Sequence, residues 1–308
     1  MKKTTIKVLF IDPKFVDWPM QLRIREILSR HYNIEYCEKP DFLFYSCFGN
    51  NYKVYDNCVK IFYTGENVSP NFNNCDYAIG FDYMSFEDRY LRYEPAYSHI
   101  NHCLASRKKA DISFAKIKFC NFIYSNENDS EGVVPRNDFC KKLSNYKRVD
   151  CPGKVLNNMN DAIEPRNGNW TQSKLDFIKN YKFTIAFENS FSKGYITEKI
   201  MHPFMADSIP IYYGDPEVLR MFNPKAFVNV RDFKNFDEVI EKIKELDNND
   251  ELYMQMLREP IITDLLQLEY DNKLEKFLSN IIEKGNKPFF HAKYHLPEER
   301  YRIKLFKY

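Results

Sequence analysis

Short apolar runs alternate with longer helical patterns through most of the chain. A short apolar run is typical of a buried strand, whereas apolar residues three and four apart lie on one face of a helix. The runs that predict strands are Lys7–Ile11, Phe42–Cys47, Lys60–Thr64, Tyr77–Ile79, Lys118–Tyr124, Phe183–Phe187, Ile209–Tyr213 and Phe227–Val230. The helical patterns are Met20–His31, with Leu22, Ile24, Ile27 and Leu28 on its inner side, then Ser173–Asn180, Ile196–Asp207, Phe236–Asp247 and parts of 250–283. Strands that alternate with helices predict parallel sheets covered on both faces, an α/β fold.

The strands fall into two sets, and 308 residues are enough for two domains of about 100 to 200 residues each. We expect a first α/β domain over 1–112 and a second over 113–285, facing each other across a cleft. After Gly285 the composition changes, and 286–308 form a tail rich in basic and aromatic residues. Such a tail can lie on an anionic membrane surface or pack across the other domain, and the sequence leaves both open.

Charge and glycine spacing exclude several classes of protein. The 45 Lys and Arg residues nearly balance 43 Asp and Glu, for a formal net charge of +2, so nothing predicts binding to nucleic acid. Nine glycines are present, and none is close enough to another to form G-x-G-x-x-G or a P-loop, which excludes both of those nucleotide-binding motifs.

Cysteine spacing and hydropathy indicate where in the cell the protein is expected. The eight cysteines include no C-x-x-C pair, which argues against a zinc ribbon or a thioredoxin-type site. Lys7 and Asp12 interrupt the only apolar run near the start, and no run is long enough to span a membrane. The expected location is the cytoplasm, with reduced thiols. Peripheral contact with the inner face of the cytoplasmic membrane stays open because of the tail.

A candidate general base follows the third predicted strand. The strand ends at Thr64, Gly65 permits a sharp turn, and Glu66 comes next. In open α/β sheets the ligand crevice lies beyond the carboxyl ends of the strands, which is where a catalytic carboxylate would act. The alternative is a solvated glutamate in a turn.

Two further segments carry candidate anion-binding groups. A helix beginning near Thr197 would place Glu198 and Lys199 in its first turn, where backbone N–H groups and a lysine suit a diphosphate and a glutamate can bind ribose hydroxyls. Arg136 follows a polar loop and Pro135, which favours a helix start, and could hold a phosphate in bidentate fashion. The alternatives are an ordinary capped helix and a surface arginine.

Metal chemistry has little support in the pattern. His99, His102 and Cys103 are close in sequence, but nothing indicates a fourth ligand. The pair His291 and His295 is equally weak. No Asp-x-Asp occurs, and transferases that hold a nucleotide diphosphate through a metal often use such a pair, so we expect no metal and no cofactor.

Several long motifs resemble one enzyme family. They are Phe187-Glu188-Asn189-Ser190, Tyr195-Ile196-Thr197-Glu198-Lys199, Ile209-Pro210-Ile211-Tyr212-Tyr213-Gly214-Asp215-Pro216, and Tyr63-Thr64-Gly65-Glu66-Asn67. On these motifs the chain is similar to the glycosyltransferase family 10 α1,3-fucosyltransferases, above all the bacterial lipopolysaccharide enzymes of the Helicobacter type. The resemblance implies a GT-B fold of two Rossmann-like domains, with the acceptor in the first and GDP-fucose in the second.

The resemblance also implies a reaction and roles for residues. L-Fucose would pass from GDP-β-L-fucose, with inversion, to the 3-hydroxyl of GlcNAc in Galβ1-4GlcNAc glycans, giving a Lewis x-like product on lipopolysaccharide or a related glycan. Glu66 would be the base. The donor would be bound by Arg136, Glu188, Asn189, Tyr195, Glu198 and Lys199, with Glu198 at the ribose. Two alternatives stay open: a GT-B transferase with another nucleotide sugar, and a catalytically silent nucleotide- or glycan-binding protein.

Overall fold

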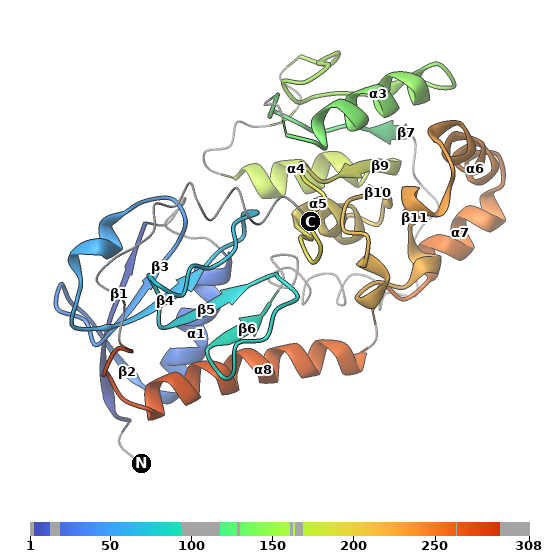
Figure 1. Cartoon of the computed structure of the whole chain (residues 1–308). Helices are drawn as coiled ribbons and strands as arrows, with labels where there is room; N and C mark the ends of the chain where they lie inside the picture. Colours follow the sequence, from blue (N-terminus) through green and yellow to red (C-terminus); the bar gives the residue numbers. More distant parts are fainter. Residues whose placement is uncertain are drawn as a thin grey trace. The chain divides into compact units, whose positions relative to one another are not determined.

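The chain was analysed as a computed structural model that describes residues 3–12, 19–93, 118–127, 130–160, 163, 169–262 and 264–289. It divides into two compact units (Figure 1). The first comprises Met1–Gly80, Met84–Tyr93 and Asn272–Tyr308, and the second Phe81–Tyr83 and Glu94–Asp271. Each unit contains one parallel sheet, so the predicted α/β fold with two parallel sheets is confirmed. The predicted boundary near 113 and the tail residues 290–308 lie outside the described residues.

The first unit is built on a parallel sheet of six strands in the order β2-β1-β3-β4-β5-β6. The strands are β1 (Thr5–Ile11), β2 (Asn33–Tyr36), β3 (Phe42–Tyr45), β4 (Val59–Tyr63), β5 (Tyr77–Gly80) and β6 (Tyr90–Arg92). Between these strands lie the α-helix α1 (Pro19–His31) and the 3-10 helix η1 (Asn51–Val54). Every residue of β3, β4 and β5 is buried, as expected for central strands covered on both faces.

Helix α1 has three of its four predicted inner residues in the core. Ile24, Ile27 and Leu28 are at most 1% exposed, whereas Leu22 is 45% exposed. The prediction for Leu22 was wrong because it lies two positions before Ile24, which turns it to the opposite side of a helix with 3.6 residues per turn.

The described residues from Asn272 onwards belong to the first unit. Helix α8 (Asp264–Glu283) buries Leu274, Phe277, Leu278 and Ile281, a stripe at helical spacing. Phe277 meets Tyr77 of β5 edge-on, and the backbone N–H of Phe289 donates to Asp76 over 2.6 Å. Residues 272–285, assigned to the second domain from the sequence, therefore contribute to the first unit, because this apolar stripe packs beside β5.

The second unit has a parallel sheet of five strands in the order β11-β10-β9-β7-β8. The strands are β7 (Lys118–Asn121), β8 (Val149–Asp150), β9 (Tyr181–Phe187), β10 (Ile209–Tyr213) and β11 (Val228–Asn229). The helices are α3 (Val133–Ser144), α4 (Trp170–Ile178), α5 (Glu198–Met205), α6 (Phe236–Asn248) and α7 (Asp250–Arg258), with short 3-10 helices at Val218–Arg220, Pro224–Ala226 and Val230–Asp232.

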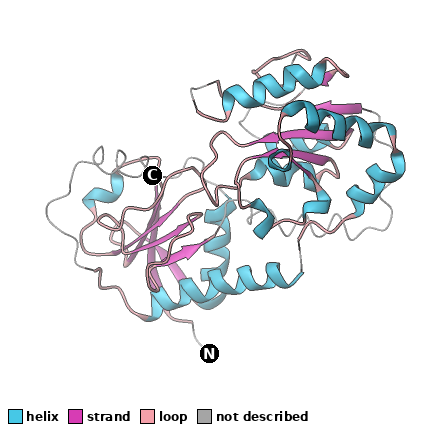
Figure 2. Ribbon diagram, turned by 45° about the vertical axis from the view of Figure 1, so that its right-hand side comes forward, coloured by secondary structure: helices cyan, strands magenta, loops and turns pink. Residues whose placement is uncertain are grey.

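The two faces of the second sheet are covered by different helices (Figure 2). Phe183, Ile185 and Phe187 point into a core shared with α3, α6 and α7. The alternate residue Thr184 lies on the other face, towards α4 and α5. This alternation is the period of two expected of a strand. The central strand β9 therefore ends between the two helix layers, and the candidate site begins directly after it.

Candidate functional site

Glu66 lies just beyond the carboxyl end of β4, where the strand pattern placed it. The turn is held by Thr64, which is fully buried and whose side-chain oxygen accepts the Glu66 backbone N–H over 3.0 Å. Cys47, after the neighbouring strand β3, lies 3.4 Å from the same hydroxyl group. The Glu66 side chain is half-buried. The first unit thus presents a carboxylate at the edge of its sheet where ligands usually bind.

In the second unit, Glu188 connects the end of β9 to the start of α5. Its side chain is completely buried. One carboxylate oxygen accepts the backbone N–H of Thr197 over 2.9 Å, and the other accepts the Thr197 hydroxyl over 2.8 Å and the Lys199 ammonium over 3.0 Å. These hydrogen bonds fix both the helix start and the direction of the Lys199 side chain.

Helix α5 begins as the sequence predicted. Thr197 is its N-cap and its hydroxyl accepts the backbone N–H of Lys199. Glu198 is the first helical residue, with a side chain 33% exposed and a carboxylate 3.9 Å from the Lys199 ammonium. The positive end of the helix dipole therefore coincides with a lysine that is only 13% exposed.

Burial and charge act together on this pair. Burial lowers the pKa of Lys199, but the Glu188 and Glu198 carboxylates outweigh it, so the pKa of Lys199 is raised and the ammonium stays charged. Burial raises the pKa of Glu188, against the effect of Lys199. The Lys199 ammonium is therefore a permanent positive charge, paired with carboxylates, in a place that is largely shielded from water.

Arg136 lies on α3 and is 0% exposed, so the alternative of a surface arginine was wrong. Its Nη1 donates to the side-chain oxygen of Asn189 over 2.6 Å, and its Nη2 donates to the carbonyl of Asn126. The guanidinium carbon lies 4.3 Å from the centre of the Tyr124 ring. Within the described residues its Nε is buried without a hydrogen-bond partner.

Tyr124 is a site residue that the sequence analysis missed. Its hydroxyl accepts the backbone N–H of Phe187 over 2.7 Å and lies 2.9 Å from the carbonyl oxygen of the same residue. The Tyr124 ring therefore packs against the Arg136 guanidinium, and its hydroxyl group is hydrogen-bonded to the end of β9. In the sequence it ends an apolar run, and that run gave no sign of a role beyond the core.

Two glycines allow the backbone around Glu188 to pack closely. A Cβ atom on Gly132 would overlap the Glu188 carbonyl oxygen and come within 2.8 Å of the Asn189 backbone. A Cβ atom on Gly214 would lie 2.6 Å from the Glu188 Cγ atom. Gly132 also donates its N–H to the Asn189 carbonyl over 2.9 Å. The start of α3 and the β9–α5 connection are thus in direct contact.

Five of the predicted site residues belong to one region of the second unit: Arg136, Glu188, Asn189, Glu198 and Lys199. Tyr195 lies in the turn before α5 and is 4% exposed. Glu66 belongs to the first unit.

The weak metal candidates His99, His102, Cys103, His291 and His295 lie outside the described residues. Within the described ranges, no three His, Cys, Asp or Glu side chains are grouped to hold a metal ion, and no helix could cross a membrane.

Two family models match the chain, one over each part. The model described as "Alpha-(1,3)-fucosyltransferase FucT N-terminal domain" matches residues 10–99. The model described as "Glycosyltransferase family 10 (fucosyltransferase) C-term" matches residues 114–258 and so includes every candidate donor residue.

Individual proteins agree with these matches. An α-(1,3)-fucosyltransferase of Helicobacter pylori is 37% identical over 76% of this chain and 55% of its own length. A fucosyltransferase of Acanthamoeba polyphaga mimivirus is 31% identical over 72% of this chain and 36% of its own length. The chain thus spans about half, or less, of the length of these two relatives.

Solved structures cover nearly the whole chain. A crystal structure of an α1,3-fucosyltransferase with GDP-fucose superposes with a TM-score of 0.75 at 30% identity, over 96% of this chain and 94% of that one. A structure of an α1,3-fucosyltransferase with GDP gives 0.74 at 31% identity, over 91% of both chains. The expected GT-B-like fold is confirmed by this similarity.

Proposed function

This chain belongs to glycosyltransferase family 10, the fucosyltransferases, and from that membership we propose that it is an inverting α1,3-fucosyltransferase that uses GDP-β-L-fucose. The observation that carries the proposal is the Lys199 ammonium at the start of α5, which is only 13% exposed and is fixed by Glu188. A fixed cation beside helix N–H groups suits a diphosphate. The solved fucosyltransferase structures with GDP-fucose and GDP support this choice of donor.

In the proposed reaction, charge develops on the leaving group. The bond between the fucose anomeric carbon and the diphosphate oxygen breaks, and GDP leaves with the electron pair. Lys199 and Arg136 provide positive charge for the diphosphate, and their effect is large because Arg136 is buried and Lys199 is only 13% exposed. Glu188 acts as a positioning residue, since its carboxylate accepts hydrogen bonds from Thr197 and Lys199.

The remaining roles concern the sugar and the acceptor. Glu66 accepts the proton of the attacking hydroxyl group, whose oxygen forms the new bond to fucose. Glu198, which is partly exposed at the first turn of α5, binds the ribose hydroxyls, and Asn189 and Tyr195 line the phosphates and the fucose. We propose that the acceptor is the GlcNAc 3-hydroxyl in a Galβ1-4GlcNAc glycan, giving a Lewis x-like product on lipopolysaccharide or a related glycan.

Cofactor use and location are part of the same proposal. Two fixed cations can stabilise a leaving diphosphate as a metal ion does in other transferases, so the reaction needs neither metal nor cofactor. The enzyme acts in the cytoplasm. Its basic aromatic tail, 286–308, either provides peripheral contact with the inner face of the membrane or packs on the protein, as Phe289 does against Tyr77.

A matrix of donors and acceptors tests the proposal. GDP-fucose, GDP-mannose and UDP-galactose are each incubated with N-acetyllactosamine and with its type 1 isomer, in the presence of EDTA, and the product linkage is determined by NMR. The expected product is α1,3-fucosylated GlcNAc, formed from GDP-fucose alone. Turnover of another donor would disprove the choice of fucose, and GDP binding without any turnover would indicate a silent nucleotide-binding protein. A requirement for added Mn²⁺ would contradict the metal-free reaction.

A further inference from the structure

The carboxyl ends of three neighbouring strands of the first unit carry linked polar residues. The strands β1, β3 and β4 are consecutive in the sheet, and they are followed by Asp12, Ser46 and Thr64. Ser46 and Thr64 are at most 1% exposed, and a buried hydroxyl group is normally hydrogen-bonded. The partners of Thr64 include the backbone of the candidate general base, Glu66.

The Thr64 hydroxyl group contacts the Glu66 backbone at both its N–H and its carbonyl. It accepts the Glu66 N–H over 3.0 Å, and it lies 3.4 Å from the Glu66 carbonyl oxygen. The same carbonyl accepts the Val68 N–H over 2.7 Å. A hydroxyl group has one proton to donate and two lone pairs, and the Cys47 thiol, 3.4 Å away, is a third neighbour of this one. The Glu66 backbone is therefore held in a tight turn against the Thr64 side chain.

Gly65 gives this contact its importance for the direction of the Glu66 side chain. Glycine loses more conformational freedom on ordering than any other residue, so the covalent chain by itself directs the next residue only weakly. The Thr64 hydroxyl group spans Gly65 and connects Glu66 to the end of β4. Every residue of β4 is buried, and a functional group is held more precisely when it is supported by a rigid element.

The loop after β3 supports the same hydroxyl group from the neighbouring strand. The Ser46 hydroxyl donates to the Asp12 carbonyl, and the Asp12 carboxylate accepts the Asn51 N–H over 3.0 Å. Both ends of this loop are thus hydrogen-bonded to the residue that follows β1. Cys47 lies within the loop, and its thiol contacts Thr64. The three strand ends therefore form a hydrogen-bonded frame behind the turn that carries the base.

We propose that Thr64 is a positioning residue of the reaction, whose hydroxyl group holds Glu66 in the orientation from which its carboxylate accepts the proton of the attacking hydroxyl group. The inference rests on the proposed function, since it assumes that Glu66 is the general base. Thr64 is 0% exposed, so it acts through Glu66 and not on the substrate. A positioned base contributes about 10²–10⁴ to the rate, and a displacement of about 1 Å can cost about 10²-fold. Removal of the hydroxyl group should therefore cost part of what Glu66 contributes.

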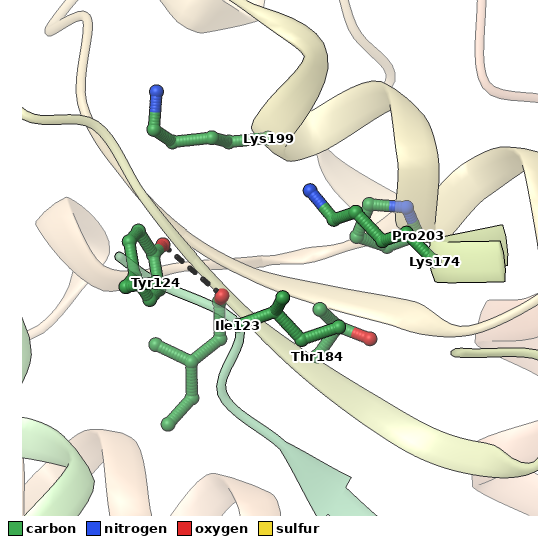
Figure 3. A pocket seen from close by; sticks show the side chains of 7 residues that line it. Ile123, Tyr124, Lys174, Thr184, Lys199 and Pro203 are labelled. Atoms are coloured by element: carbon green, nitrogen blue, oxygen red, sulfur yellow. Dashed lines mark hydrogen bonds between the residues drawn. The ribbon is translucent and has the colours of Figure 1, made fainter. Parts of the chain in front are cut away.

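A double-mutant cycle with Glu66 separates positioning of the base from a merely structural role. Turnover of GDP-fucose with N-acetyllactosamine is measured for the wild type, Thr64→Val, Glu66→Gln and the double variant, with Thr64→Ser as the matched control. Valine keeps the shape of threonine without the hydroxyl group, whereas serine keeps the hydroxyl group. The candidate donor residues, among them Lys199 beside the small pocket of Figure 3, belong to the second unit, so GDP affinity is the internal reference.

The expected result is a loss of turnover that depends on the presence of the base. Thr64→Val lowers kcat about 10- to 100-fold when Glu66 is present, and less than about twofold in the Glu66→Gln background, because the two residues act as one unit. The dissociation constant of GDP changes by less than about twofold, and Thr64→Ser keeps most of the turnover. An equal loss in both backgrounds, or wild-type turnover of Thr64→Val, would overturn the role of Thr64.

The two proposals fail in different ways. If the wild type transfers no fucose, or if Glu66→Gln keeps near-normal turnover, the proposed function is wrong in its donor or its base, and Thr64 loses its role with it. If Glu66→Gln is slow and Thr64→Val causes the same further loss in both backgrounds, only the inference about Thr64 is wrong. Thermal unfolding establishes that each variant is folded, and Thr64→Ala replaces the valine variant if that variant is not.

Discussion

The guanidinium of Arg136 and the side-chain amide of Asn189 are joined by a 2.6 Å hydrogen bond, although 53 positions separate them in the sequence. The bond connects α3 to the loop after β9, where Gly132 and Asn189 also share a backbone hydrogen bond of 2.9 Å. Arg136 and Asn189, both expected at the donor phosphates, thus hold each other in position. A substitution of either residue should therefore change the position of the other.

Asn189→Ala should destabilise the protein and weaken GDP binding. It leaves Nη1 of a fully buried arginine without its acceptor, and an unsatisfied buried donor costs about 1–3 kcal/mol, more when it is charged. Differential scanning calorimetry and a GDP titration would measure the two effects. An unchanged melting temperature would mean that the Arg136–Asn189 bond contributes nothing to the fold.

Lys199→Met should reduce both stability and GDP affinity, because it leaves the buried Glu188 carboxylate without its cation. Breaking a buried ion pair from one side costs about 3–5 kcal/mol. The double variant Glu188→Gln/Lys199→Met should recover much of the stability, since no buried charge then lacks a partner. It should not recover GDP affinity.

Urea unfolding and GDP titration of the three variants separate these two roles of Lys199. Recovery of GDP affinity in the double variant would show that the lysine matters only for the fold. Glu188→Gln alone should keep a folded protein with weaker GDP binding, because Lys199 is then less firmly directed.

Glu66→Gln should lower turnover by a factor of about 10²–10⁴, the usual contribution of a positioned general base. GDP affinity should be kept, since Glu66 lies in the first unit and the candidate donor residues lie in the second. Steady-state kinetics together with a GDP titration would measure both, with Glu38→Gln as a control at an exposed position of the same unit. Near-normal turnover of Glu66→Gln would disprove its role as the base.

Asp150 should make the free energy of unfolding depend on pH in the acidic range. Burial raises its pKa, but hydrogen bonds from Tyr181 over 2.7 Å and Arg148 over 2.8 Å outweigh burial, so the pKa is lowered in the folded protein. The stabilisation is present above the unfolded pKa of about 3.9 and is lost as pH falls through the lower folded value. In Asp150→Asn, urea unfolding between about pH 6 and pH 3 should vary less with pH than in the wild type. Identical pH profiles would contradict the effect.

The central elements of the fold were predictable because they are apolar and periodic. β9, β10 and α6 lie within two residues of their predicted ranges, since each buries a face that repeats at the period of its structure. The strands β2, β6 and β8 were missed. β2 has no buried residue and β8 has only two residues, so neither leaves an apolar run in the sequence.

The candidate site likewise has a part that could be predicted from the sequence and a part that could not. Glu188, Thr197 and Lys199 are near one another in sequence, and their grouping at the end of a strand could be predicted. The contact between Arg136 and Asn189 depends on how α3 packs, which no local pattern records. Gly132 looked like a loop residue, although it packs directly on the Glu188 backbone.

The first unit is assembled from residues before 94 and after 271, and this bears on the order in which the two units can fold during synthesis. Phe277 and Phe289 pack against Tyr77, so that strand lacks these two partners until residues 277–289 have left the ribosome. Domains made first usually fold first. Here residues 94–271 are all available before the first unit is complete. A truncation before Asn272 would therefore harm a unit most of which is synthesised before residues 94–271.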